Sequence, residues 1–369
     1  MYSDLKPALL LGGQNLLNCL NKDKNYLPNW FLNVDETYKA EFYFWWPGHN
    51  LGRWWDAMLR LEEAVDFLIP PEFEAAMLEN MRLFFDNPDS WCIQPDLYGG
   101  KDFALDMHSI RESLLALTAL IRCRNSVWAE KIAHRMLETI QRAARDDGEW
   151  DFDQFVYFRK CSKLPDLTCH PTGTSGRAIE ALVLYYETTG DELAYHLAER
   201  FARWHFEHSI HEDGTITGIP NLDHTHSFLG TLRGLFLFGK LAGRRNYIDK
   251  VKQCYQKTVR TMIKESGYSS HDIGYEKQQE PASAGDAAQL ALWFALDGSS
   301  GFLDDAERIV RARILPSQVT KTPRLTPAGS GSDQYERLEE RVLGGFGGMH
   351  LLPHGGKRNT TDVTAACLH

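Results

Sequence analysis

The stretch Tyr275–Ala295, YEKQQEPASAGDAAQLALWFA, predicts a loop with two carboxylates that leads into a nearly apolar helix. Pro281 suits the first position of a helix, because the amide proton that proline lacks would have no partner there. Glu280 lies just before it, where the positive end of the helix dipole favours an anion. The residues after Pro281 are apolar around most of the helix, which is typical of a helix buried on all sides. The stretch therefore predicts a carboxylate at the mouth of a buried helix.

The same pairing of an apolar helix with an amphipathic helix recurs along the chain. Apolar helices are predicted to begin near residues 50, 104, 174, 225 and 281, a spacing of about 50 to 70 residues. An amphipathic helix follows each of them after a short turn. Antiparallel hairpins of this kind bury their apolar helices when they form two concentric rings. The pattern predicts an all-α fold, an (α/α)6 barrel that forms a single domain over residues 1–369.

The sixth hairpin of this barrel is incomplete in the sequence. Five hairpins are complete, and a further apolar helix is predicted to begin at Thr360–Asp362, close to the last residue. A helix is also predicted over 6–20, interrupted at Gly12 and Gly13. We expect either that the sixth hairpin lacks its end or that the N-terminal helix completes it. An incomplete hairpin would also favour a homo-oligomer.

Composition excludes several classes of function. The chain has a net charge of −10 and no basic run, so we expect neither nucleic acid nor an anionic membrane as a partner. No stretch approaches the roughly 20 apolar residues that span a bilayer. The ten tryptophans favour a cleft for ligands with flat apolar faces, although large helical cores use tryptophan too.

The cysteines and the N-terminus bear on the cellular compartment. Seven cysteines are scattered without a CxxC pair, which favours free thiols over disulfides or a structural zinc site. The first residues lack a basic segment followed by a long apolar run, so we read no signal peptide. We expect a cytoplasmic protein, or a periplasmic one if a leader has been removed.

The loops before the apolar helices carry the candidate functional residues. Alternation of inner and outer helices makes the inner helices parallel, so that their N-terminal ends meet at one end of the barrel. The candidate catalytic residues are Glu280 and a second carboxylate, Asp223 or Asp106. The candidate substrate-binding residues in the same loops are Trp45, Trp46, His49, His108, His170, His224, His226, Tyr275, Gln278, His350, His354 and Arg358.

This combination of residues suits the recognition and cleavage of sugars. Carboxylates, histidines and arginines bind paired hydroxyl groups, and tryptophan packs against sugar rings. Cleaving a glycosidic bond needs one protonated carboxyl group as the acid and a second carboxylate as base or nucleophile. Desolvation in a tryptophan-lined pocket would raise the pKa of the acid. Asp286, six residues after Glu280, is as consistent with a functional as with a structural role.

Several candidates also have purely structural interpretations. Asp223 could serve only as a helix cap, and His108 could be a buried core histidine. Arg111 and Glu112 are predicted to form an ion pair, buried or on the helix surface. His224 and His226 are two residues apart, which does not place both side chains on one helical face, so we expect no metal ion and no cofactor there.

Three motifs resemble those of the (α/α)6-barrel glycoside hydrolases, and more narrowly the β-L-arabinofuranosidase-like group. HNLGRWWDAMLRLEEA (49–64) is similar to the first inner-helix motif of that group, and NTTDVTAACLH (359–369) to its cysteine-bearing segment. QEPASAGDAAQLALWFALDG (279–298) is similar to its Glu-Thr-Cys-Ala helix, with Glu280 at the position of the glutamate. The resemblance implies the barrel fold, a carbohydrate substrate and a carboxylate mechanism. Ala282 and Ser283 replace residues of the middle motif and Cys367 stands alone, so zinc and a cysteine nucleophile are not carried over.

Two other functions fit the same barrel. A polysaccharide lyase or sugar epimerase would abstract a proton with a histidine and neutralise an acidic substrate with cations, for which His170, His224, His226, Lys357 and Arg358 are candidates. A non-catalytic scaffold would bind a sugar without converting it, but would not need so many titratable groups. The sequence therefore favours an exo-acting glycoside hydrolase over these alternatives.

Overall fold

The structure is a computed structural model. It describes most of the chain, namely residues 5–29, 31–33, 39–41, 47–93, 107–151, 174–216, 224–322, 324–347 and 358–368.

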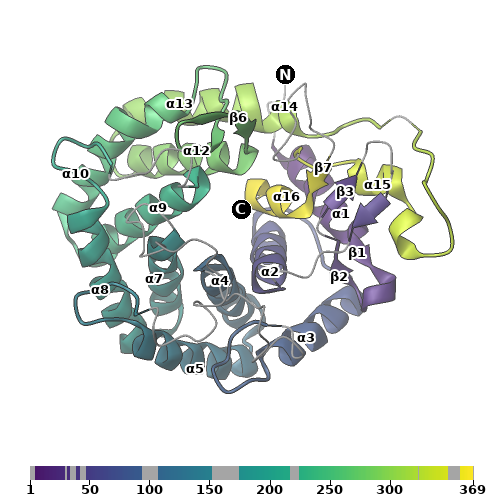
Figure 1. The fold of residues 1–369 in the computed structure, drawn as a ribbon, viewed down its shortest axis with the longest axis horizontal. Helices are drawn as coiled ribbons and strands as arrows, with labels where there is room; N and C mark the ends of the chain where they lie inside the picture. The colour runs from purple at the N-terminus through teal and green to yellow at the C-terminus, as the bar shows by residue number, and fades with distance from the viewer. Residues whose placement is uncertain are drawn as a thin grey trace.

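The helices form two concentric rings, with the inner ring around the centre of the molecule (Figure 1). Successive inner helices pack against each other, and each outer helix packs against the inner helix of its hairpin. The predicted (α/α)6 barrel is confirmed. The inner helices are α2 (Pro47–Ala64), α4 (Met107–Arg124), α7 (Ala178–Thr189, after a 3-10 turn at Thr174–Arg177), α9 (Thr225–Leu241), α12 (Pro281–Leu296) and α16 (Thr361–Leu368). The outer helices are α3 (Pro71–Phe85), α5 (Val127–Ala143), α8 (Glu192–His208), α10 (Arg245–Cys254) with α11 (Arg260–Met262), α13 (Leu303–Ile309) with α14 (Leu315–Ser317), and α1 (Lys6–Asn18).

Burial separates the two rings as the apolar pattern predicts. Fourteen of the 17 residues of the inner helix α9 are buried, so this helix contacts protein on nearly every side. The outer helix α5 buries eight of its 17 residues, which lie along one stripe that faces the inner ring. Ser126 caps α5 by accepting a hydrogen bond from the amide of Ala129, as its position before the apolar run predicts.

The first and last helices of the chain close the ring together. Inner helix α16 packs between α12 and α2, and α1 packs against the outside of α16. The N-terminal helix therefore completes the sixth hairpin, which is the second of the two expected alternatives. The homo-oligomer stays a prediction. The predicted interruption of α1 is wrong, because its helix is continuous through both glycines. A Cβ at Gly12 would lie 2.7 Å from Leu368, so this glycine allows the two helices to approach closely.

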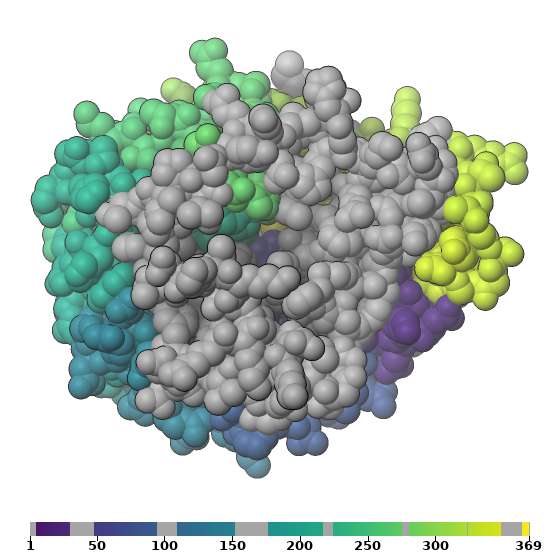
Figure 2. Space-filling view, viewed as in Figure 1, coloured from purple at the N-terminus to yellow at the C-terminus, as the bar shows by residue number. Residues whose placement is uncertain are grey.

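A long segment between α14 and α16 packs onto the outside of α1. It contains a short helix, α15 (Leu338–Val342), and it projects beyond the ring of outer helices in yellow-green (Figure 2). The side-chain amide of Asn15 donates to the carbonyl oxygens of Arg341 and Leu343, at 2.6 and 2.9 Å. Arg341 is itself buried and paired with Asp333 at 2.5 Å, so the segment is fixed to the N-terminal helix by polar contacts.

Short antiparallel strands border the barrel. β1 (Leu20–Asn21) pairs with β2 (Leu27–Pro28), and β3 (Phe31–Asn33) lies between β4 (Lys39–Glu41) and β7 (Arg358–Thr360). β5 (Ser270–Asp272) pairs with β6 (Tyr275–Gln279), which leads directly into α12. The sequence EWDFDQFVYFRK (149–160) alternates apolar and polar residues, which predicts a strand, but it lies almost entirely outside the described residues. Within the part of the chain that the structure describes, no helix combines the length and apolarity that crossing a membrane requires.

Candidate functional site

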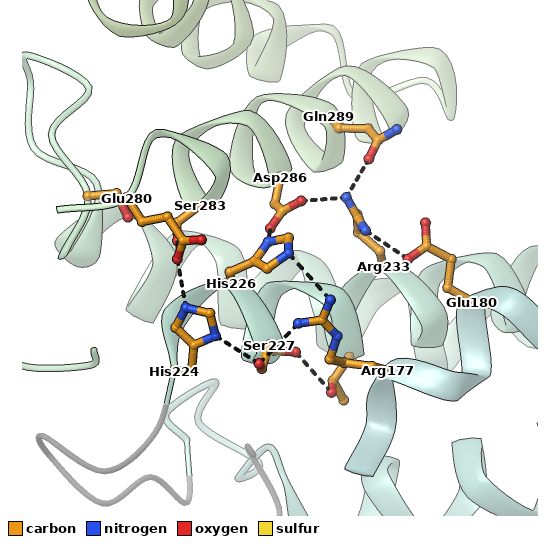
Figure 3. Close-up of polar contacts among 12 residues, drawn as sticks. Arg177, Glu180, His224, His226, Ser227, Arg233, Glu280, Ser283, Asp286 and Gln289 are labelled. Atoms are coloured by element: carbon orange, nitrogen blue, oxygen red, sulfur yellow. Dashed lines mark hydrogen bonds and ion pairs between the residues drawn. The ribbon is translucent and has the colours of Figure 1, made fainter. Parts of the chain in front are cut away.

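The N-terminal ends of α9 and α12 meet at Glu280 and His224. Each residue directly precedes its helix, and Nε2 of His224 lies 2.6 Å from Oε2 of Glu280 (Figure 3). The Glu280 side chain is 2% exposed and that of His224 is 21% exposed. The expectation that these two loops share one end of the barrel is confirmed.

Backbone hydrogen bonds hold this meeting point together. The amide of Glu280 donates to the carbonyl oxygen of Ser269 at 3.1 Å, next to the β5–β6 ladder. His224 forms an isolated antiparallel bridge with Asp272 on the other side of β5. Strand β5 therefore connects the beginnings of both helices and fixes their distance.

A second histidine joins the pair from β5. The ring of His271 lies 4.4 Å from that of His224, and its Nδ1 is 2.7 Å from Oδ1 of Asp272. Nδ1 of His224 lies 3.1 Å from the hydroxyl of Ser227, and the hydroxyl of Ser283 donates to Glu280 at 3.4 Å. We call His224, His271 and Glu280 the histidine–glutamate cluster.

The histidines determine the charge state of Glu280. Burial alone would raise the pKa of this carboxyl group, but the charge and hydrogen bond of His224 outweigh burial, and the charges of His271 and Arg53 act in the same direction. The pKa therefore lies well below its ordinary value. Glu280 is ionised at neutral pH, which suits a base, a nucleophile or a metal ligand rather than the proton donor that desolvation alone would produce.

A second layer of polar groups lies further along α9 and α12. Nδ1 of His226 contacts Asp286, and Nε2 of His226 lies 3.4 Å from Arg177 (Figure 3). Nε2 of His226 also contacts Arg53. Because a guanidinium group only donates hydrogen bonds, Nε2 of His226 accepts and its proton is on Nδ1. His226 is thus a neutral donor to Asp286, and burial together with the charges of Arg53 and Arg177 keeps its pKa well below the ordinary value.

This second layer is a network of arginines and carboxylates contributed by five inner helices. Glu112 accepts from Arg111 at 2.7 Å and from Arg177 at 2.6 Å. Glu180 accepts from Arg111 at 2.7 Å and from Arg233 at 2.8 Å, and Arg233 also donates to Asp286 at 2.5 Å. We call these groups the arginine–carboxylate ring: Arg53, Arg111, Glu112, Arg177, Glu180, Arg233 and Asp286, all at most 5% exposed.

The carboxylates of the ring differ in their pKa values. Burial raises the pKa of Asp286 from its ordinary 3.8 to about 6, although the charges of Arg233 and Arg111 act in the opposite direction. Burial would also raise the pKa of Glu112, but Arg111, Arg53 and Arg177 together hold it well below its usual range. Two carboxylates of α12, Glu280 and Asp286, therefore have pKa values displaced in opposite directions, a pattern typical of acid–base sites.

A small pocket lies against the arginine–carboxylate ring, inside the barrel. Ala365 and Ala366 of α16 form its apolar wall, and the remaining lining consists of polar side chains. Those side chains are Arg53, Asp56, Arg111, Glu112, His226, Arg233 and Asp286, three arginines against three carboxylates and one histidine.

Four of the predicted site residues lie in or beside the histidine–glutamate cluster and the arginine–carboxylate ring. Glu280 and His224 lie in the histidine–glutamate cluster, His226 contacts the ring, and His49 is buried on α2, where its charge acts on Glu112. The remaining predicted positions lie outside the residues, or the side chains, that the structure describes: Asp223, Asp106, Trp45, Trp46, His108, His170, Tyr275, Gln278, His350, His354 and Arg358.

Sequence reasoning identified only part of the polar network. The predicted ion pair of Arg111 with Glu112 is confirmed as a buried pair. His271 was missed because it lies on a three-residue strand without a periodic signal. The ring was missed too, although a visible signal existed: an arginine recurs within an otherwise apolar inner helix at Arg53, Arg111, Arg177 and Arg233.

Comparison with known proteins finds likeness at the level of the fold. The sequence matches no protein-family model and no curated protein. The structure is similar to an unsaturated glucuronyl hydrolase from Bacillus sp. GL1, with a TM-score of 0.64 and 14% identity over 98% of this chain and 93% of that one. It is also similar to an inactive variant of an α-1,6-mannanase from Salegentibacter sp. bound to α-1,6-mannotetrose, with a TM-score of 0.60 and 13% identity over 99% of this chain and 97% of that one.

These two proteins are (α/α)6-barrel glycoside hydrolases, and the likeness covers nearly the whole of each chain. The narrower resemblance to the β-L-arabinofuranosidase-like group is not confirmed by them. At this level of identity the likeness establishes the shared (α/α)6 barrel, and the residues of the site must carry any argument about chemistry.

Proposed function

We propose that this protein is a glycoside hydrolase whose reaction centre is the histidine–glutamate cluster. The observation that carries the proposal is a buried, ionised carboxylate, Glu280, at the end of the barrel where the inner helices α9 and α12 begin. Structurally similar barrels include a glucuronyl hydrolase and a mannanase, which supports a carbohydrate substrate by analogy of fold.

In this proposal Glu280 acts as the base or nucleophile. Its lowered pKa keeps it charged at neutral pH, and the hydrogen bond from His224 orients the carboxylate. Glycosidases pair such a carboxylate with a protonated carboxyl group. Asp106, directly before α4, and Asp223, two residues before α9, remain the candidates for that proton donor.

The buried arginines next to the histidine–glutamate cluster do not support the alternative of a lyase or epimerase reaction. A lyase needs uncompensated positive charge near the carboxylate of its substrate. Among the described residues that line the pocket, the three arginines face three carboxylates, and Arg111 and Arg233 are already paired with Glu112, Glu180 and Asp286. These arginines therefore offer no excess of positive charge to an acidic substrate, and the proposal of hydrolysis rests on Glu280.

A release assay on aryl glycosides and aryl uronides tests this proposal. We expect phenolate release from at least one of them, and we expect Glu280→Gln to lower kcat/KM by about 100-fold or more, the usual size of an acid–base contribution. Glu265→Gln is the matched control, because Glu265 is exposed on the surface and should leave the rate unchanged.

Two outcomes would contradict the proposal. Full activity of Glu280→Gln on a good substrate would remove Glu280 from the reaction. Formation of the unsaturated-uronide chromophore from polyuronides, without phenolate release, would mean β-elimination, and the histidines would become the leading catalytic candidates.

A further inference from the structure

We infer that His224, His271 and Glu280 bind one divalent transition-metal ion, with zinc as the expected metal. The potential ligand atoms of these three residues all lie within 4.8 Å of one another. Two imidazoles and one carboxylate form a donor set typical of zinc sites with an open position and of sites for neighbouring divalent metals. This inference goes beyond the proposed function and does not depend on it, because metal binding is measured without a glycoside.

The spacing of the three side chains matches what a metal ion requires. Nitrogen and oxygen ligands lie about 2 Å from zinc, so in a tetrahedral site they lie roughly 3 to 4 Å from one another. His224 Nε2 and Glu280 Oε2 are 2.6 Å apart, in hydrogen-bond contact. A metal between them would need these atoms to separate by about 1 Å or less, which side-chain rotation can supply.

Outer partners already orient both imidazole rings. Histidines that bind metals usually donate their second ring nitrogen to a carboxylate, a carbonyl group or water. Nδ1 of His271 is 2.7 Å from the carboxylate of Asp272, and Nδ1 of His224 is 3.1 Å from the hydroxyl of Ser227. Because Nδ1 of each ring is held by its outer partner, we assign Nε2 of each ring to the metal.

Backbone contacts fix the relative positions of the three ligands in the absence of a metal ion. His224 is bridged to Asp272, which is adjacent to His271, and the amide of Glu280 is bonded to Ser269. All three ligands are therefore connected through strand β5 and the first residues of α9 and α12. Such preorganisation lowers the cost of assembling a metal site.

The predicted site has the character of a reactive rather than a purely structural one. Structural zinc sites have four protein ligands, whereas sites with three keep a position for water or a substrate oxygen. Within the described residues the cluster offers three ligands, and His224 remains 21% exposed. A metal here would be open to a small oxygen ligand.

Equilibrium dialysis of the chelator-treated full chain against zinc tests the inference. We expect one zinc ion per chain, and a visible d–d spectrum when cobalt replaces zinc. His271→Ala should weaken zinc binding by about 100-fold or more, and Asp272→Asn by about 10- to 100-fold, the size expected for an outer partner. The matched control is His134→Ala, since His134 is 53% exposed on α5 and bonded to Asp191.

The outcomes separate this inference from the proposed function. Equal zinc binding by wild type, His271→Ala and Glu280→Gln, with all three folded by circular dichroism, would overturn the metal site. Zinc binding that both variants lose supports it, even if no glycoside is cleaved. A chelator-treated protein that takes up no zinc in the dialysis but still releases phenolate would overturn the metal site. The hydrolase proposal would then stand.

Discussion

The histidine–glutamate cluster and the arginine–carboxylate ring lie on the same helices but hold their charges in different ways. In the ring, each carboxylate is paired with arginines whose side chains are fully buried. In the cluster, Glu280 is held by histidines whose side chains are partly exposed. The two groups therefore differ in access: solvent and small ligands can reach the partners of Glu280, but not the buried partners of the carboxylates in the arginine–carboxylate ring.

The largest effect is expected when the ring is broken at Arg233. Arg233→Met removes the partner that Glu180 and Asp286 share, and leaves these buried carboxylates with fewer donors. We expect a loss of about 3 to 5 kcal/mol in the free energy of unfolding, the usual cost of breaking a buried ion pair. Urea unfolding followed by circular dichroism measures this loss.

Arg311→Met is the control for that experiment. Arg311 is about half exposed and pairs with Glu307 on the surface of the outer ring, so its loss should cost about 0.5 kcal/mol or less. Equal losses in the free energy of unfolding for the two variants would show that Arg233 in the arginine–carboxylate ring contributes no more than a surface ion pair.

The next largest effect is a pH dependence that has opposite signs for the two carboxylates of α12. The folded pKa of Asp286, about 6, exceeds its ordinary 3.8, so the stabilisation from its bound proton is complete below about pH 4 and is lost as the pH rises through 6. This change corresponds to about 3 kcal/mol. We expect the stability of wild type relative to Asp286→Asn to fall by about that amount between pH 4 and pH 7.

Glu280 should behave in the reverse way. Its folded pKa lies below the ordinary 4.5, so the stabilisation from its charge is present above that pH and is lost as the pH falls toward the folded pKa. The free energy of unfolding of wild type, Asp286→Asn, Glu280→Gln and the surface control Asp249→Asn is measured from pH 7 to below pH 4.5. Its dependence on pH gives the contribution of each carboxylate. Parallel curves for all three variants would contradict the assignment of opposite shifts.

The smallest effect is expected at Ser283, next to the histidine–glutamate cluster. Its hydroxyl donates to Glu280 at 3.4 Å, the long end of the hydrogen-bond range. We expect Ser283→Ala to cost about 1 kcal/mol or less in the free energy of unfolding and to change any glycosidase activity less than tenfold. A loss of activity as large as that of Glu280→Gln would make Ser283 an essential contact and would enlarge the cluster.

The sequence predicted the barrel well because helical periodicity is a local property. The apolar helices predicted to begin near residues 50, 104, 174, 225 and 281 correspond to α2, α4, α7 with its preceding 3-10 turn, α9 and α12. The predicted break at Gly12 failed because the contact that requires a glycine is with Leu368, at the other end of the chain. Local rules treat glycine as a helix breaker and contain no information about such a distant neighbour.

The site was less predictable than the fold. Glu280 could be located from helix-start chemistry, but its protonation depends on His224 and His271, which lie 56 and 9 residues away in the sequence. Burial raises the pKa of Asp286, whereas the histidines outweigh burial at Glu280. Only the contacts across helices decide between the two cases.

Closure of the barrel by α1 and α16 also affects folding during synthesis. The apolar residues of α1, such as Leu16 and Leu17, are synthesised about 340 residues before those of α16. At roughly 5 to 20 residues per second, the first helix waits about 20 to 70 seconds for its partner. During that interval α1 must remain soluble without its binding surface, and the wall formed by Ala365 and Ala366 does not yet exist.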